Sequence, residues 1–397
     1  MSTHLSAAAA AQRLGVSRAT LYAYVSRGLI RSRALHGKRS HEYAREDVER
    51  VAAQTKGRRD PLGVAQRALE FEGLPVLSSA LCLIDGGRLY YRGRDAVELS
   101  RSARFEDVAA LLWDGACIPA RAARPNASVR GSLARLEFAA AGAAHLALVQ
   151  ARDGSAADLA PQSVRESGGR ILSELAELAA GFPPASSEGL AARAALAFGA
   201  RSTRARRAIE SALILCADHE LNASAFAARV VAAAGATPYM AVIGALGALS
   251  GRRHGGMTAG VWQLFGALAK PSRASGLLAE RLGRGEAIPG FGHPLYPDGD
   301  PRAARLLELC PSNAEGRRAA ALARAGEHAL GVNPNVDFGL VALCRSLGLP
   351  RHAPFVLFAL GRSAGWIGHA IEQYASGSLI RPRARYVGVA PLGRDQR

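Results

Sequence analysis

Cysteine is scarce in this 397-residue chain, which has five of them and no two at CxxC spacing. An odd number of scattered thiols indicates neither a disulfide framework nor a thiolate zinc site. No apolar run approaches the roughly 20 residues that a membrane-spanning helix needs. The N-terminal residues also lack a charged segment followed by a long apolar one, so no signal peptide is predicted. These absences predict a cytoplasmic protein with free thiols and no metal site.

Acidic residues are also few, because 33 Asp and Glu stand against 50 Lys and Arg, giving a formal net charge of +17. The surplus is uneven, since residues 1–60 hold 12 basic and 5 acidic side chains and so supply +7. A basic surface favours acidic partners such as nucleic acid, phosphate groups or carboxylate substrates. A general bias toward arginine and alanine would produce the same surplus, and composition alone does not separate the two explanations.

The first sixty residues have the pattern of a small DNA-binding module. Ser6 and Ser17 are N-cap residues for two short helices separated by Gly15, the order of a helix-turn-helix. A hairpin turning at Gly37-Lys38 and a helix over 45–54 follow. This order resembles the winged helix-turn-helix of MerR and excisionase-type regulators, in which the second helix enters the major groove.

That resemblance implies base contacts from the second helix and phosphate contacts from the hairpin. The expected DNA-binding residues are Arg18, Thr20 and Tyr22 on the helix and Arg31, Arg33, Lys38 and Arg39 on the hairpin. The alternative is a helical module that makes protein contacts or inhibits the rest of the chain. We expect this module over 1–56, a basic linker over 57–62 and a separate region over 63–397.

Residues 63–210 carry little chemistry. A hairpin is predicted at Asp85-Gly86-Gly87, and alanine-rich helices follow it. His145 stands alone on an apolar helix face and is most simply a packed core residue. An apolar helical pattern then runs over 213–235, and His219 lies inside it among other polar residues. Polar groups inside such a helix need partners or a ligand.

The stretch PGFGHPLYPDGDPRA, residues 289–303, carries His293 behind two glycines and Arg302 nine residues later. Glycines allow a sharp turn or a close approach to a ligand, and the three prolines stiffen the loop. One imidazole and one guanidinium on a rigid loop suit a small anionic substrate whose carbonyl must be polarised. The same stretch also fits a structured loop with a capping histidine.

Four further residues stand out, and two of them, His254 and Asp337, have both a functional and a structural interpretation. His254 precedes two glycines at a helix junction, where it either faces a cleft or caps a helix. Asp337 opens an apolar helix, where it is either a cap or a general base aimed into a cleft. Arg362 interrupts an apolar helix and should meet an anion, because an unpaired buried arginine is costly. Arg381 lies in an extended, proline-interrupted tail.

Six segments taken in order resemble the motifs of the citrate synthase family: DHELNAS, RRHGG, PGFGHPLYPDGDPRA, NPNVDF, GRSAGWIGHAIEQ and LIRPRARYVG. The strong resemblance covers residues 215–388, and a weaker one extends to earlier segments. It implies a mainly α-helical, citrate synthase-like fold with large and small helical domains, the small one over roughly 225–330. It also implies a homodimer with the site between domains.

The resemblance assigns a role to each singled-out residue. Asp337 would remove a proton from the methyl group of acetyl-CoA, His254 would hydrogen-bond the thioester oxygen, and His293 would polarise the oxaloacetate carbonyl. Its other oxaloacetate ligands are His219, Arg302, Arg362 and, from the partner subunit, Arg381. Citrate and CoA would be the products, with no metal or cofactor. The residue types suit this chemistry, because an aspartate enolises a thioester only where the enolate charge is neutralised as it forms.

Two departures from the family pattern leave alternatives open. Pro294 stands where the family often has a basic residue, which weakens a phosphate contact to CoA, and Met257-Thr258 replace a usual Ala-Asn. Synthesis of 2-methylcitrate from propionyl-CoA and cleavage of citryl-CoA are therefore alternatives, since one methylene changes binding only by roughly 1–3 kcal/mol. A different class of function is a DNA-binding regulator that senses metabolites with the synthase fold. A sensor needs the arginines but not Asp337.

Overall fold

The computed structural model describes residues 4–26, 29–34, 41–49, 51, 77–117, 125–182, 189–382, 384 and 386–389. The chain forms two compact units, Met1–Ser78 and Ser79–Arg397. The predicted linker over 57–62 and the hairpin turn at Gly37-Lys38 lie outside the described residues. Within the described part, no helix combines the length and apolarity that crossing a membrane requires.

The first unit contains a small antiparallel sheet and short helices. Its elements are β1 (His4–Ser6), α1 (Ala7–Leu14), α2 (Arg18–Ser26), β2 (Ser32–Ala34) and β3 (His41–Ala44), with strand order β1-β3-β2. The Ser6 hydroxyl accepts the Ala9 amide, and Gly15 ends α1 at a φ of 63°. The predicted helix boundaries and hairpin pairing therefore agree with the structure, whereas the third strand, β1, was not predicted. Residues 45–49 and 51 are helical, as expected.

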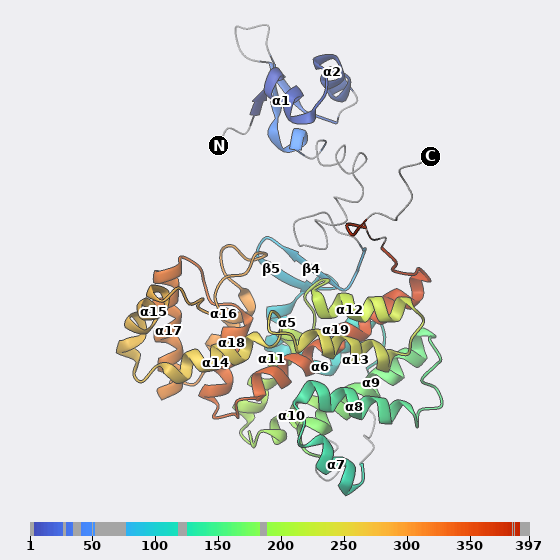
Figure 1. Cartoon of the computed structure of the whole chain (residues 1–397), viewed down its shortest axis with the longest axis vertical. Coiled ribbons are helices and arrows are strands. Elements are labelled where there is room, and N and C mark those ends of the chain that lie inside the picture. The colour runs from blue at the N-terminus through green and yellow to red at the C-terminus, as the bar shows by residue number, and fades with distance from the viewer. Residues whose placement is uncertain are drawn as a thin grey trace. The chain divides into compact units, whose positions relative to one another are not determined.

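The second unit is mainly helical, as predicted (Figure 1). It opens with the antiparallel strands β4 (Cys82–Asp85), β5 (Arg88–Tyr91) and β6 (Arg94–Asp95), and the expected hairpin turns at Gly86 and Gly87, where φ is 55° and 73°. The first half of its helices comprises α5 (Ala96–Ser102), α6 (Phe105–Trp113), α7 (Ala127–Leu133), α8 (Phe138–Gln150), α9 (Pro161–Ala179), α10 (Leu190–Ala197) and α11 (Thr203–Cys216).

The second half of the unit carries the motifs that the sequence singled out. Its elements are α12 (Ala223–Ala233), α13 (Pro238–Leu249), α14 (Met257–Ala267), the 3₁₀ turn η1 (Pro271–Arg273), α15 (Ala274–Gly283), α16 (Pro301–Leu309), α17 (Ala314–Leu330), α18 (Val336–Ser346) and α19 (Ala353–Ser376). In Figure 1, α14 to α18 gather at one end of the unit. α19, drawn in red-orange, runs through its middle.

Two apolar clusters hold this unit together. The main one includes side chains of α6, α9, α11, α13 and α19. A smaller one joins α14, α15, α17 and the phenylalanine that follows Asp337 in α18. Helix α19 is buried along most of its length because its side chains are small or apolar on every face.

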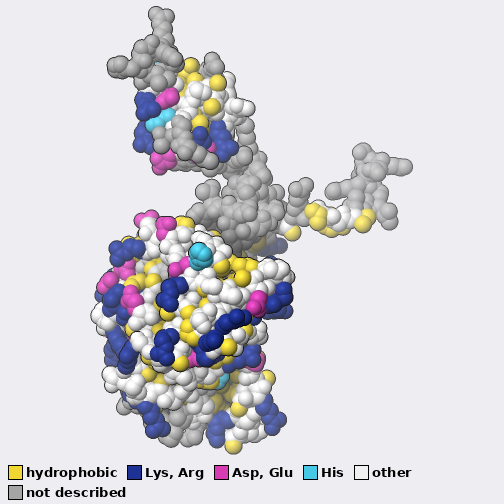
Figure 2. Space-filling view, turned by 90° about the vertical axis from the view of Figure 1, so that its left-hand side faces the viewer, with side chains coloured by type: hydrophobic (Ala, Val, Ile, Leu, Met, Phe, Trp, Pro, Cys, Tyr) yellow, Lys and Arg dark blue, Asp and Glu magenta, His cyan; other side chains and the backbone are white. Residues whose placement is uncertain are grey.

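The basic surplus lies outside, where Lys and Arg outnumber Asp and Glu over the face shown in Figure 2.

The expected continuous helix over 213–235 is wrong. Helix α11 ends at Cys216, and α12 begins only at Ala223. Asn222 caps α12 by accepting the amides of Ser224 and Ala225 through its side-chain oxygen. A side chain that competes for backbone donors favours a cap over a helix interior. His219 consequently lies in a non-helical break, with Glu220 beside it at a φ of 51°.

Candidate active site

The loop that carries His293 is joined to the segment that precedes α18. The Gly292 amide donates to the Asn333 carbonyl at 2.8 Å, and the Asn335 amide donates to the Gly290 carbonyl at 2.9 Å. Gly290 has a φ of 91°, and a Cβ there would lie 3.0 Å from Val261. The glycine therefore permits both the turn and the close contact.

Asn335 strengthens this junction with both ends of its side chain. Its Nδ2 donates to the Gly292 carbonyl at 3.1 Å, while its Oδ1 accepts the amides of Asp337 and Phe338. Asn335 is thus the N-cap of α18, so the structural interpretation of Asp337 as the cap is wrong. The Asp337 carboxylate is not needed as a cap, because the Asn335 side chain already accepts the amides at the start of α18.

Asp337 has the electrostatics of a general base. Its Oδ1 is buried and, within the described part of the chain, has no hydrogen-bond partner. Burial is the largest cause that raises the pKa of Asp337 to about 7, with Asp300 adding to the rise and Arg302 and Arg362 opposing it. A carboxyl poised near neutral pH can take up a proton and release it again.

Arg302 and Asp300 form a buried ion pair at the start of α16. Asp300 accepts Nε of Arg302 at 2.9 Å through one oxygen and Nη2 at 2.8 Å through the other. Both side chains are almost completely buried, and the carboxylate raises the pKa of the guanidinium. Nη1 makes no hydrogen bond within the described residues, so it remains available to an anion.

His219 and His293 lie side by side in this region. Their ring centroids are 5.0 Å apart, and Tyr296 contacts both rings. Burial lowers the pKa of His219 well below its ordinary value, with Arg302 and Arg362 adding to the effect. Burial, then Arg302, lowers the pKa of His293 to about 4. Both imidazoles are therefore neutral near pH 7.

The hydrogen on the His293 ring can be assigned. Its Nδ1 lies 3.2 Å from the backbone amide of Leu295, which can only donate. Nδ1 is therefore the acceptor, and the single hydrogen of the neutral ring is on Nε2. A neutral imidazole with Nε2–H is a hydrogen-bond donor that can polarise a carbonyl oxygen.

His254 lies in the turn between α13 and α14 and is also neutral. Burial, then Arg362, lowers its pKa to about 4. Its Nε2 is 2.8 Å from the Ser224 hydroxyl, which accepts the Trp366 indole N–H at 3.1 Å and also lies 2.8 Å from Oδ1 of Asn222, an acceptor. One ring nitrogen of His254 is therefore held by the protein, and the other is left for a ligand.

Arg362 projects from the middle of α19 beside these groups. Its Nε donates to the Cys216 carbonyl at 2.7 Å, and its guanidinium lies over the Phe358 ring, which also contacts His254. The side chain is 1% exposed, and burial lowers its pKa. Within the described residues its two terminal nitrogens make no hydrogen bonds, so the anion that the sequence calls for is not a protein carboxylate.

The structure thus gathers six of the seven expected active-site residues in one buried region, and Arg381 is the exception. Arg381 follows the end of α19 and is exposed, without a hydrogen bond to any described residue. The sequence did not single out Asp300, Asn335, Ser224 or Tyr296. Asp300 and Asn335 carried a usable signal, because Asp and Asn directly before a helix are common caps.

The expected DNA-binding residues are only partly described. The Tyr22 side chain is 54% exposed, whereas the Thr20 hydroxyl contacts that of Ser17 at 3.0 Å. Arg31 pairs with Asp47 and Arg33 with Glu42, and both arginine side chains remain largely exposed, at 71% and 61%. The side chain of Arg18 and all of Lys38 and Arg39 lie outside the described residues.

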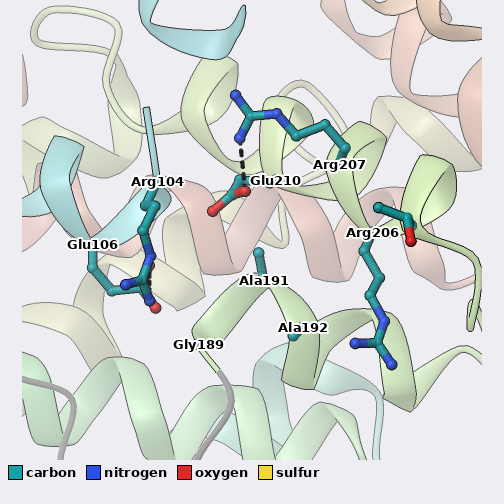
Figure 3. Close-up of a pocket in the computed structure, with 9 residues that line it drawn as sticks. Arg104, Glu106, Gly189, Ala191, Ala192, Arg206, Arg207 and Glu210 are labelled. Carbon is teal, nitrogen blue, oxygen red and sulfur yellow. Dashed lines mark hydrogen bonds and ion pairs between the residues drawn. The ribbon is translucent and has the colours of Figure 1, made fainter. Parts of the chain in front are cut away.

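Two cavities lie away from this region. One of about 250 Å³ is lined by Arg104, Arg206, Arg207, Glu106 and Glu210. Figure 3 shows Arg207 paired with Glu210, at 2.8 Å, and Arg206 directed away from that pair. Another of about 220 Å³ includes His145, whose Nε2 is 2.7 Å from Glu174. Neither cavity contains an expected catalytic residue, and His145 is buried as predicted.

Two family models together match nearly the whole chain. A family model described as citrate synthase, C-terminal domain, matches residues 70–383, and one described as a helix-turn-helix domain matches residues 5–56. Citrate synthase 2 of Bacillus subtilis is 30% identical over 357 residues, 80% of this chain and 95% of that protein. 2-methylcitrate synthase 1 of Corynebacterium glutamicum is 36% identical over 190 residues, 46% of this chain and 50% of that protein.

A solved structure shares the fold of the second unit. It is the ternary complex of carboxymethyl coenzyme A and oxaloacetate with citrate synthase from Thermoplasma acidophilum. That chain is 25% identical, with a TM-score of 0.73, and the match covers 82% of this chain and 97% of that one.

Proposed function

This chain belongs to the citrate synthase family, and we propose that it condenses acetyl-CoA with oxaloacetate and water to give citrate and CoA. One observation carries the proposal beyond family membership. A carboxyl group with a pKa of about 7, Asp337, lies in one buried region with neutral histidines and two buried arginines. Proton abstraction from a carbon acid beside a dianionic electrophile needs this combination.

The first step is enolisation of the thioester. Asp337 takes a proton from the methyl carbon, and His254 donates a hydrogen bond to the thioester oxygen as charge develops there. Nε2 of His254 and Oδ1 of Asn222 each lie 2.8 Å from the Ser224 hydroxyl and compete for its single hydrogen. We assign that hydrogen to Nε2 when acyl-CoA is bound, so that Nδ1 keeps the ring hydrogen and acts as the donor. A donor that is already oriented stabilises the enol without reorganising in the transition state.

The second step is attack of the enol carbon on the ketone of oxaloacetate. His293 donates from Nε2 to the ketone oxygen. As the new carbon–carbon bond forms, the π bond of the ketone breaks and its electron pair moves to that oxygen, which takes the Nε2 proton of His293. The proton that Asp337 removed from the methyl group replaces it. We assign the two carboxylates of oxaloacetate to His219, Arg302 and Arg362, with the partner subunit's Arg381 completing the site in a homodimer. Hydrolysis of the citryl-CoA thioester then releases citrate and CoA, and no metal or cofactor takes part.

Thiol release measures this activity directly. The full chain should release CoA from acetyl-CoA only when oxaloacetate is present, and Asp337→Ala should abolish the release. Asp298→Ala is a matched control, because Asp298 is an exposed carboxylate in the His293 loop. Equal turnover by the Asp337→Ala variant and the unmodified chain would exclude Asp337 as the base.

The acyl group is a second question, because relatives of this chain include a 2-methylcitrate synthase. Propionyl-CoA in the same assay gives the preference as a ratio of kcat/KM values. An apolar pocket discriminates one methylene by only about 10- to 200-fold, so both substrates need testing. Citryl-CoA supplied alone tests the cleavage direction.

We further propose that the chain acts in the cytoplasm as a dimer and that its N-terminal helix-turn-helix module, residues 1–56, binds DNA. In this proposal residues 57–62 link the module to the catalytic region, 63–397, whose small domain lies within roughly 225–330. The exposed Tyr22 on α2 and the match to a helix-turn-helix model support DNA binding. Affinity of the full chain for duplex DNA should fall steeply with added salt.

A regulator that only senses metabolites is the competing function. It would bind oxaloacetate or citrate without turning over either thioester, and ligand would change its affinity for DNA. Turnover by the unmodified chain, lost in Asp337→Ala, counts against the sensor. Ligand-dependent DNA affinity in an active enzyme would mean that both roles are present.

A further inference from the structure

Tyr296 contacts three of the residues that we assign to oxaloacetate. Its hydroxyl lies 3.1 Å from Nε2 of His219. Its ring centroid lies 5.1 Å from that of His293, and the guanidinium of Arg302 lies over its face at 5.4 Å. Its side chain is buried, with 2% of the residue exposed. These three contacts indicate that Tyr296 does more than fill space in the core, because each joins it to a residue that we assign to the substrate.

The loop holds Tyr296 in place through its backbone. The Tyr296 amide donates to the His293 carbonyl at 3.0 Å, and its own carbonyl accepts the Gly299 amide at 3.1 Å. These turns place the tyrosine three residues after His293 and keep both side chains on the same part of the loop. The position of the hydroxyl is therefore set by the same backbone that sets the position of His293.

Two hydrogens are available to the hydrogen bond between Tyr296 and His219: one on the neutral imidazole ring and one on the hydroxyl. His219 is neutral because burial and the two nearby arginines oppose its protonation, so its ring has one hydrogen. Burial also raises the pKa of Tyr296, which keeps the phenol protonated. If the phenol donates to Nε2, the ring hydrogen is on Nδ1. If Nε2 donates to the phenol, the hydroxyl hydrogen is free for a substrate oxygen. In the first arrangement Nδ1 of His219 is the donor left for the substrate, and in the second it is the Tyr296 hydroxyl.

The ring has a second effect. Arg302 is fixed on one side by Asp300 and on the other by the face of Tyr296. A guanidinium over an aromatic face is attracted to the negative charge of the π system. The tyrosine ring thus restrains the arginine and the His293 imidazole together.

We propose that Tyr296 is a positioning residue of the oxaloacetate subsite, whose hydroxyl orients His219 and whose ring holds His293 and Arg302. This inference rests on the proposed function, since it takes oxaloacetate as the occupant. It adds a phenol to a subsite otherwise built from histidines and arginines. Loss of the hydroxyl should therefore weaken oxaloacetate binding without changing the response to acyl-CoA.

Tyr296→Phe is the direct test, because it removes one oxygen and keeps the ring. The KM for oxaloacetate should rise about three- to tenfold, the loss expected for one hydrogen bond. The KM for acetyl-CoA should stay within about twofold, since the hydroxyl contacts no group assigned to the thioester. Tyr296→Leu removes the ring as well and should also lower kcat, because His293 and Arg302 lose a shared contact.

Tyr239→Phe is a matched control, since Tyr239 is fully buried and its hydroxyl hydrogen-bonds Asp153 at 2.7 Å, outside this site. It should leave both KM values unchanged, which separates a local effect from a general loss of packing. An unchanged oxaloacetate KM in Tyr296→Phe would overturn the inference.

A binding measurement keeps this test distinct from that of the proposed function. Oxaloacetate alone should raise the unfolding temperature of the unmodified chain, and raise it less in Tyr296→Phe at the same concentration. If the unmodified chain shows no turnover, the synthase proposal fails while this comparison still tests Tyr296. Equal shifts in the two proteins would overturn the role of the hydroxyl.

Discussion

Asp300 binds Arg302 through both carboxylate oxygens, at 2.9 and 2.8 Å, and one of these oxygens also accepts the amide of Val336 at 2.9 Å. A single carboxylate therefore ties the start of α16 to the start of α18, which carries Asp337. Because both members of the pair are buried, each depends on the other for compensation of its charge. The pair therefore stabilises the packing of α16 against α18 and also fixes the Arg302 side chain in the candidate site.

Asp300→Ala should lower the free energy of unfolding by about 3–5 kcal/mol, because it leaves the Arg302 guanidinium buried without its partner. The variant should also bind oxaloacetate more weakly, since Arg302 loses its orientation. Urea unfolding measures the first effect and the oxaloacetate KM the second. Asp298→Ala removes an exposed carboxylate two residues away. It should change the free energy of unfolding by no more than about 0.5 kcal/mol and leave the oxaloacetate KM unchanged.

Ser224→Ala should lower kcat about tenfold, because His254 loses the group that fixes its ring and sets its proton. The KM for oxaloacetate should change little, since Ser224 contacts none of the groups assigned to that substrate. Ser250→Ala is the comparison, because it removes a hydroxyl whose one hydrogen bond among the described residues is to the Gly247 carbonyl, at an exposed helix end. A normal kcat in Ser224→Ala would mean that His254 is oriented by other contacts.

The sequence predicted the residues of the candidate site better than it predicted how they are held. His293, Arg302 and Asp337 stand in short motifs whose residue types suggest the chemistry directly. The supporting contacts span longer separations, such as Arg362 with the carbonyl of Cys216, 146 positions earlier. No periodicity reports such a contact, because it arises when two helices pack.

Local sequence patterns predicted one helix wrongly. The helix expected over 213–235 is interrupted because Asn222 caps α12 and leaves His219 in a non-helical segment. Apolar periodicity continued through this point, so the cap was the competing signal. Arg381 illustrates a different limit, since its assigned role requires a second subunit and no feature of one chain positions it.

Catalytic efficiency should rise with pH up to about 7 and then level off. Asp337 must be ionised to accept a proton, and its pKa is about 7, whereas His254 and His293 have pKa values near 4 and stay neutral throughout. The log of kcat/KM for acetyl-CoA should therefore climb with unit slope below about pH 7. A flat profile between pH 5.5 and 8 would contradict the assignment of Asp337 as a buried base.

Acid should destabilise the fold through the two histidines. Their folded-state pKa values lie near 4, below the ordinary 6.5, so between these values the unfolded chain binds protons that the folded chain does not. Stability that is present above pH 6.5 is consequently lost as pH falls toward 4. Asp337 offsets part of this loss, because its raised pKa makes the folded chain bind a proton that the unfolded chain does not. His254→Asn should reduce this dependence, and urea unfolding at a series of pH values measures it.

Gly365→Ala should separate the two helices on which Arg362 depends. An added Cβ would lie 2.4 Å from the carbonyl oxygen of Ala217, which accepts the Gly365 amide at 3.0 Å, and 2.5 Å from Oδ1 of Asp218. Because a backbone carbonyl cannot move aside alone, α19 must shift away, which should cost about 1–3 kcal/mol.

That shift would also move Arg362, which lies one turn earlier on α19 and donates to the carbonyl of Cys216. The oxaloacetate KM should therefore rise together with the loss of stability. Gly247→Ala is the matched control, because this glycine lies inside α13 and an added Cβ there would meet open space. Alanine there should stabilise the helix by about 0.5–1 kcal/mol and leave the KM unchanged. If Gly365→Ala were as stable as Gly247→Ala, close packing of α19 against α11 would not be what positions Arg362.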